Sequence, residues 1–234
     1  MCVIIHKPAS VMLSKKILRK CFIANNDGFG VAYRDNGIVK YTKGLLTLDQ
    51  IYTTLNPIMH LELAIHFRLA THGKTDHHNA HPFFLASTPR KTKGIDTSKS
   101  IALLMHNGVI SHLGTTHYSD TVDLCTRILS KCKDIDHIID ILDLIGDKFL
   151  LITTEKMIKV GKYVEHKACY FSNLNWDYTV KTYGAYTAAH QKQYGTSLYS
   201  DDSEFYDDLR YADYEVDEID EIEKAIQDEI KDKK

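Results

Sequence analysis

The chain has 234 residues, of which 44% are hydrophobic and 26% are charged, and its formal net charge at pH 7 is −2. These values are ordinary for a globular protein, and the length suits one domain with a short appendage. No run of 18 apolar residues occurs and the first residues do not form a secretion signal, so neither a membrane span nor export is expected. The five cysteines are never spaced CxxC, which favours reduced thiols in the cytoplasm over a disulfide framework or a zinc ribbon.

Charge is distributed unevenly along the chain. Residues 201–234 contain 15 acidic and 5 basic residues, a net of −10, which leaves 16 acidic and 24 basic residues, a net of +8, for residues 1–200. We therefore expect a domain at 2–200 and an acidic tail at 201–234, which is either a solvated extension or one amphipathic helix that docks on a partner. The basic excess forms no Lys/Arg stripe with interleaved aromatic residues, so no nucleic-acid partner is expected. The apolar stripe of the tail helix would consist of Ile219, Ile222, Ile226 and Ile230.

The first half of the domain is predicted to consist mainly of strands. Residues 28–44 form two alternating runs joined by Asn36-Gly37, a pair that favours a tight hairpin turn. Thr47 is a suitable N-cap for the helix that follows it. The other elements expected in this half are strands at 2–7, 61–71 and 100–108 and a helix at 48–55.

The second half is predicted to begin with two helices and to end with strands. Ser119 and Asp120 open a helical pattern that runs to residue 131, and Asp134 caps a second helix. The expected apolar faces are Val122, Cys125, Ile128 and Leu129 on the first helix, and Ile135, Ile138, Ile139 and Leu142 on the second. A hairpin at 147–160 and a β segment at 163–178 complete the pattern. Hairpin-rich strands with helices in the middle of the chain predict an α+β fold.

Cys2 directly follows Met1, at the head of an apolar strand. Free cysteine often packs as a small hydrophobic residue, so this position alone does not indicate function. Removal of Met1 would however place a thiol and a free α-amine on one residue. A nucleophile with its own base attached is a known catalytic arrangement.

Three polar clusters stand at predicted strand or helix ends, where loops commonly carry function. They are HFRLATHGKTDHHNAHPF at 66–83, HNG at 106–108 and SDT at 119–121. The histidines of these clusters are His66, His72, His77, His78, His81 and His106. None of them falls into HExxH or another defined ligand spacing, so we expect neither a metal site nor a cofactor.

The three clusters together offer groups that suit acyl transfer on an amino acid. An Asn107 amide and a Gly108 backbone N–H can donate to one oxyanion, although HNG can also be an ordinary Asn-Gly turn. Arg68 can bind a carboxylate through two parallel hydrogen bonds, or form a surface salt bridge. Asp120 can accept an ammonium group, or cap its helix.

Taken together with Cys2, these clusters resemble the glutaminase domain of class II glutamine amidotransferases. That family has an N-terminal cysteine followed by H-x-R-x-A-T-H-G, N-A-H-P, H-N-G and a D-T helix start, in the order found here. The segment DGFGVA at 27–32 also resembles short standalone members, including those encoded by phages. Two positions depart from the family: Val3 stands where glycine is usual, and Leu69 where tryptophan is frequent.

The resemblance implies an N-terminal-nucleophile hydrolase fold, a four-layer αββα sandwich. It implies that Cys2 is the nucleophile once Met1 is removed. The remaining implied roles are an oxyanion hole formed by Asn107 and Gly108, substrate contacts from Arg68 and Asp120 to the α-groups of glutamine, and a pocket lining that includes Thr71 and His72.

The implied activity is hydrolysis of the glutamine side-chain amide to glutamate and ammonia through a Cys2 thioester. The implied location is the cytoplasm, or the host cytoplasm if the chain is phage-encoded. Because 234 residues leave no space for a synthase domain, a separate synthetase or ligase is expected to accept the ammonia. Two alternatives stay open: a hydrolase of γ-glutamyl peptides or another amide, and a catalytically idle scaffold that docks partners.

Overall fold

The computed structural model describes residues 2–69, 77–94 and 102–177. The acidic tail at 201–234 and the proposed domain end at residue 200 lie outside these residues. Within the described ranges, no helix is both long enough and apolar enough to span a membrane.

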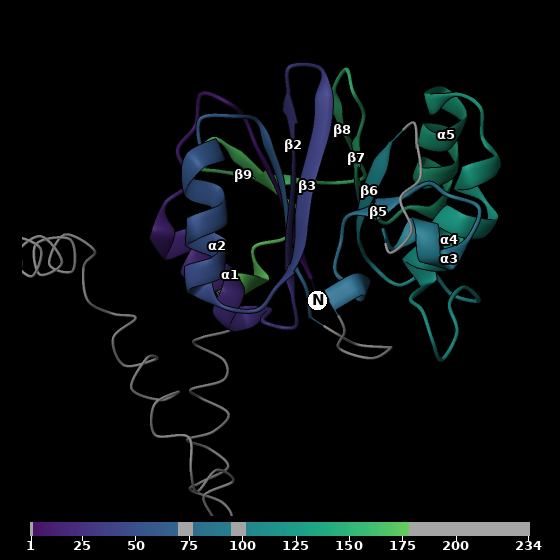
Figure 1. Cartoon of the computed structure of the whole chain (residues 1–234), viewed down its shortest axis with the longest axis horizontal. Helices are drawn as coiled ribbons and strands as arrows, with labels where there is room; N and C mark the ends of the chain where they lie inside the picture. Colours follow the sequence, from purple (N-terminus) through teal and green to yellow (C-terminus); the bar gives the residue numbers. More distant parts are fainter. Residues whose placement is uncertain (1, 70–76, 95–101, 178–234) are drawn as a thin grey trace, which may run out of the picture. The chain divides into compact units, whose positions relative to one another are not determined.

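Two antiparallel sheets form the centre of the domain (Figure 1). The first sheet has the order β3-β2-β4-β1-β10-β9 and the second has the order β5-β6-β7-β8. The strands of the first sheet are β1 (Val3–Lys7), β2 (Phe29–Asp35), β3 (Ile38–Leu45), β4 (Leu63–Phe67), β9 (Val164–His166) and β10 (Cys169–Phe171). Those of the second are β5 (Phe83–Phe84), β6 (Leu103–Asn107), β7 (Lys148–Ile152) and β8 (Met157–Val160). The predicted mixture of helices and antiparallel strands is confirmed.

The helices lie on the outer faces of the sheets (Figure 1). They are α1 (Lys15–Ala24), α2 (Leu48–Leu55), α3 (Pro89–Thr92), α4 (Asp120–Arg127) and α5 (Ile135–Ile145), with short 3-10 turns at Asn56–Ile58, His77–Asn79 and Leu129–Lys131. One apolar cluster joins α1 and α2 to the first sheet, and a second joins α4 and α5 to the second sheet. A third cluster contains residues of both sheets and lies between them.

The alternation of side chains along β1 assigns its two faces. Val3 and Ile5 belong to the cluster under α1 and α2, whereas Ile4 belongs to the cluster between the sheets. Leu103 and Met105 of β6 contribute to that same inner cluster. Because successive strand residues point to opposite faces, Cys2 shares the inner face of the strand with Ile4.

The predicted turn and cap chemistry is confirmed at two places. Asn36 and Gly37 have φ angles of 50° and 76°, which is the pair of left-handed conformations required by the tight turn between β2 and β3. The Thr47 side chain accepts the N–H of Gln50, and the Gln50 side chain accepts the N–H of Thr47, so a complete capping box starts α2.

Two differences from the sequence prediction concern helices. The helix α1 was not expected, although Ser14 caps it and buried Ile17, Leu18 and Cys21 supply a helical apolar face. Ile128 was expected on the buried face of α4 and is 38% exposed. The reason is that α4 ends at Arg127, so Ile128 no longer follows the helical phase of the buried residues before it.

Candidate active site

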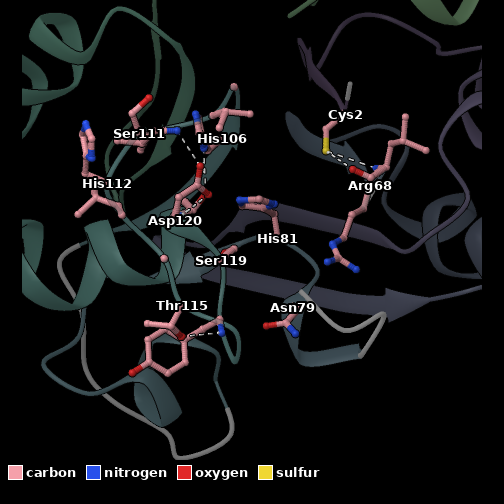
Figure 2. Close-up of a pocket in the computed structure, with 18 residues that line it drawn as sticks. Cys2, Arg68, Asn79, His81, His106, Ser111, His112, Thr115, Ser119 and Asp120 are labelled. Carbon is pink, nitrogen blue, oxygen red and sulfur yellow. Dashed lines mark hydrogen bonds between the residues drawn. The ribbon is translucent and has the colours of Figure 1, made fainter. Parts of the chain in front are cut away.

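Four of the predicted site residues line one cavity of about 260 Å³: Cys2, Arg68, Gly108 and Asp120. Strand pairing explains part of this convergence, because Val3 at the start of β1 is paired with Phe67 at the end of the antiparallel β4. The residues just outside that pair, Cys2 and Arg68, are therefore neighbours. Figure 2 shows these two on one side of the cavity, Asp120 on the other side and His81 between them.

The Cys2 thiol is partly buried and is held by the backbone of Leu69. Sγ donates to the Leu69 carbonyl oxygen at 3.5 Å, and the Leu69 N–H donates to Sγ at 3.4 Å. Burial raises the pKa of the Cys2 thiol above its usual value, and the Leu69 N–H and the charge of Arg68 offset only part of that rise. The thiol is consequently protonated at neutral pH and needs a base before it can act as a nucleophile.

The Arg68 side chain is only 6% exposed, and its Nη1 atom is buried with no hydrogen-bond partner among the described residues. Its backbone is fixed, because its N–H donates to the Gly28 carbonyl at 2.8 Å and its carbonyl accepts from the Asp27 N–H at 3.0 Å. The alternative of a surface salt bridge is wrong, since the side chain is not at the surface. A buried guanidinium nitrogen without a partner is costly unless an anion binds to it.

Asp120 forms the first turn of α4 on the other side of the cavity. Ser119 is the N-cap of this helix, with its hydroxyl accepting the Val122 N–H, so the Asp120 carboxylate is not needed as the cap. Asp120 Oδ2 accepts the Ile110 N–H at 2.8 Å, and Oδ1 accepts the Thr121 N–H at 2.7 Å. The Thr121 hydroxyl also donates to Oδ1 at 3.2 Å, so these bonds fix the carboxylate and leave Oδ2 able to accept from a further donor.

Asn107 and Gly108 occupy different positions relative to the cavity. Gly108 lines it, whereas Asn107 is buried at the end of β6 and does not belong to the lining. The Asn107 amide donates to the hydroxyl of Ser172 at 2.8 Å. The alternative of a simple Asn-Gly turn is wrong, because Asn107 is paired with Lys148 in the sheet.

Gly108 and Gly30 are glycines because other groups occupy the space of a side chain. A Cβ atom at Gly108 would overlap the carboxylate of Asp147, and one at Gly30 would overlap the carbonyl oxygen of His81. The second contact seats the segment that contains His81 directly on β2. Close backbone approach is a recognised use of glycine.

Two fully or nearly buried histidines, His66 and His81, lie with their ring centroids 4.2 Å apart, and His81 is part of the cavity lining. Burial and neighbouring positive charge lower the pKa of His66 to about 3 and also lower the pKa of His81. Both rings are therefore neutral. Among the residues that the structure describes, no group of three or more His, Cys, Asp or Glu side chains is arranged to hold a metal ion.

Sequence reasoning missed some residues and could not be checked at others. Thr71 and His72 lie outside the described residues. Ser172 and Asn173, which follow β10, were not expected near the site, yet Asn173 Nδ2 donates to the Cys2 carbonyl at 2.9 Å and Ser172 contacts Asn107. Their sequence neighbourhood gives no motif for this role, because the contacts join residues far apart in the chain.

No protein-family model matches the chain, and no curated protein matches its sequence. Among solved structures, it is similar to glutamine phosphoribosylpyrophosphate (PRPP) amidotransferase from B. subtilis complexed with ADP and GMP, with a TM-score of 0.49 and 17% sequence identity. The match covers 73% of the present chain and 41% of that enzyme, so the chain spans less than half the length of this similar structure.

Proposed function

We propose that the protein hydrolyses the side-chain amide of glutamine through a thioester on Cys2. The observation that carries this proposal is that Arg68, whose buried Nη1 has no partner among the described residues, lines one cavity with Cys2 and, on the opposite side, with the fixed carboxylate of Asp120. Arg68 suits the α-carboxylate of an amino acid and Asp120 suits its α-ammonium group. A ligand whose two α-groups are held in this way presents its side chain to the remaining lining, which includes Cys2.

The proposed mechanism begins with removal of Met1, which makes the α-amine of Cys2 available as the base. An α-amine has a usual pKa of roughly 7.7–8.0 and can take the thiol proton near neutral pH. The sulfur then attacks the amide carbon, and the oxyanion is held by the Gly108 N–H and the Asn107 amide. The C–N bond breaks as the amine returns its proton to the leaving nitrogen, and ammonia departs. Water hydrolyses the thioester, which yields glutamate and regenerates the thiol.

We further propose that the two sheets and their outer helices are the four-layer αββα sandwich of N-terminal-nucleophile hydrolases. In this proposal residues 2–200 form the glutaminase domain, and Thr71 and His72 complete the pocket lining. The apolar cluster between the sheets and the two outer clusters support the layering.

Ammonia released at neutral pH is quickly protonated, so we propose that a separate synthetase or ligase accepts it. The acidic tail at 201–234 is proposed to be either a solvated extension or the docking segment for that partner. Deletion of 201–234 separates these roles: it leaves hydrolysis and all associations unchanged in the first case, and abolishes co-purification with the ammonia-using enzyme in the second.

Release of glutamate from glutamine, compared with a panel of γ-glutamyl amides, tests the proposed function. Wild-type protein with Cys2 at its N-terminus, verified by intact mass, should release glutamate, and the Cys2→Ala protein should not. Preference for γ-glutamyl peptides over glutamine would change the substrate but not the site. Full activity in protein that uniformly retains Met1 would exclude the α-amine as the base.

A further inference from the structure

Ser172 connects the nucleophile's strand to the strand that carries Asn107. Its Oγ accepts the Ile4 N–H at 2.9 Å, and its own N–H donates to the Ile4 carbonyl at 2.9 Å. The side chain is 1% exposed, so these bonds form away from solvent. Ser172 is thereby fixed to β1 only two residues after Cys2.

The same Oγ atom accepts a hydrogen bond from Asn107 Nδ2 at 2.8 Å. A hydroxyl oxygen has two acceptor lone pairs, and the Ile4 N–H and the Asn107 amide occupy both of them. A side-chain amide has two N–H bonds, so one is engaged by Ser172 and the other stays available for a different acceptor. Ser172 thus restrains the rotation of the Asn107 amide.

The residue that follows Ser172 holds the nucleophile itself. Asn173 Nδ2 donates to the Cys2 carbonyl at 2.9 Å, and Asn173 Oδ1 accepts the Asn175 N–H at 3.0 Å. The dipeptide Ser172-Asn173 therefore contacts both the backbone of Cys2 and the amide of Asn107. This short segment after β10 sets the position of the Asn107 amide with respect to the Cys2 backbone.

We propose that Ser172 is a positioning residue that aims the free N–H of Asn107 at the oxyanion formed on the substrate of Cys2. This inference rests on the proposed function for its catalytic consequence. Its structural part, that Ser172 holds one Asn107 N–H, does not depend on which substrate is used.

The kinetic test is Ser172→Ala, which removes the acceptor without adding volume. We expect kcat for glutamine to fall about tenfold to a hundredfold, less than the roughly 100- to 1000-fold typical of losing an oxyanion donor outright, with KM changed by less than about threefold. Alkylation of Cys2 by iodoacetamide, a displacement that forms no oxyanion, should keep its wild-type rate. Ser130→Ala is the matched control, because it removes a partly buried hydroxyl that donates to the Thr126 carbonyl, and neither residue lines the cavity.

A double-mutant cycle with Asn107→Ala tests whether Ser172 acts through Asn107. In the Asn107→Ala background, Ser172→Ala should change kcat by less than about threefold, because the group it positions is already absent. Additive losses, or an unchanged or higher kcat in a folded Ser172→Ala protein, would overturn the proposal.

A measurement on the wild-type protein separates this proposal from the proposed function. In NMR spectra assigned with the Asn107→Ala variant, one Nδ2 proton of Asn107 should be protected from exchange with water and the other should exchange rapidly. If the wild type shows this exchange pattern but does not hydrolyse glutamine, the proposed function is overturned and the positioning role of Ser172 is retained. Equal exchange of both protons would overturn the positioning role, whether or not Ser172→Ala folds.

Discussion

An arginine lies near each end of the strand pair β1 and β4, and the two arginines differ in whether a carboxylate of the described residues contacts them. At one end Nη2 of Arg34, on the neighbouring β2, contacts Glu62 Oε2 at 2.6 Å, so these two charges are paired, and the other oxygen of Glu62 lies 2.8 Å from Nε2 of His6. At the other end Arg68 is more deeply buried and its Nη1 has no partner among the described residues. The first end is thus closed by the chain's own carboxylate, whereas the second end is open to an anionic ligand.

This difference agrees with the proposal that Glu62 and its partners support the fold, whereas Arg68 binds a ligand. A buried charge that the chain does not pair lowers stability, and such a cost is common at binding sites. Glu62, in contrast, has its partners within the chain, and neither it nor those partners line the cavity.

Replacement of Cys2 by alanine should have the largest effect. We expect loss of glutamine hydrolysis by about 1000-fold or more, because no other group at this position forms the thioester. A glutamine-analogue electrophile should add one adduct to the wild type, located at Cys2 by peptide mapping. The thiols of Cys21, Cys125 and Cys169 are buried and their pKa values are raised by burial, which leaves Cys132 as the control for nonspecific labelling.

Labelling of Cys132 in place of Cys2 would mean that the nucleophile has been assigned wrongly. The melting temperature of Cys2→Ala should stay close to that of the wild type, since the thiol is only partly buried and contacts the Leu69 backbone only through weak hydrogen bonds to sulfur.

Replacement of Arg68 should come next. Arg68→Met removes the cation, and we expect KM for glutamine to rise about tenfold to a hundredfold, which corresponds to a charged hydrogen bond of about 1.5–3 kcal/mol. Arg68→Lys should recover only part of the binding, because an ammonium group cannot form the planar two-point contact. Steady-state kinetics and urea unfolding would be measured together, because loss of an unpaired buried charge should leave stability unchanged or raised.

The matched control is Arg34→Met at the paired end of the strands. It should lower stability, because Glu62 loses a partner, and should leave KM within about twofold of the wild type. A rise in KM in this control as large as that of Arg68→Met would remove the distinction between the two ends.

The distinction could be predicted from sequence at the open end but not at the closed end. The resemblance carried by HFRLATHG, HNG and SDT predicted one site that contains Cys2, Arg68, Asn107, Gly108 and Asp120, and all of these except Asn107 line one cavity. The pairing of Arg34 with Glu62 depends on β2 lying beside β4, a register that no local pattern reveals. Ser172 is similar, since its bond to Ile4 spans 168 residues.

Errors in the helices have local causes instead. The Ser14 cap and the Ile17, Leu18 and Cys21 spacing of α1 were present in the sequence and were not used. Ile128 fitted the helical period of α4, but the helix ends one residue before it. Periodicity gives the face of a helix more reliably than its last turn.

The pH dependence of stability should differ between the two ends. The pKa of His66 in the folded protein is about 3. As pH falls below about 6.5, the His66 ring therefore binds a proton in the unfolded chain but stays unprotonated in the folded chain. Stability is then lost at about 1.4 kcal/mol per pH unit for this group down to about pH 3. His66→Phe should reduce that slope, as measured by urea unfolding at pH 7, 6 and 5.

His6 at the closed end provides the comparison for this measurement. Burial also lowers its pKa, but the hydrogen bond with Glu62 raises it in part, so His6→Phe should flatten the slope less than His66→Phe. A larger effect from His6 would show that pairing with Glu62 does not offset the burial of its ring.

Glu62→Gln should have the smallest effect and is the sharpest test of the closed end. The variant keeps the shape of the side chain but removes the charge that faces Arg34 and His6. Because these groups are partly exposed, we expect a loss of only about 1 kcal/mol in the free energy of unfolding at pH 7, and a smaller loss in high salt. The pKa of Glu62 is lowered by His6 and Arg34, so its stabilising charge is present above its unfolded pKa and is lost as pH falls through the lower folded pKa. The wild type and Glu62→Gln should therefore approach equal stability below about pH 4, while their kcat and KM for glutamine at pH 7 stay equal. A change of more than about twofold in either kinetic constant would contradict the division, because it would mean that pairing at one end of β1 and β4 controls the cavity at the other.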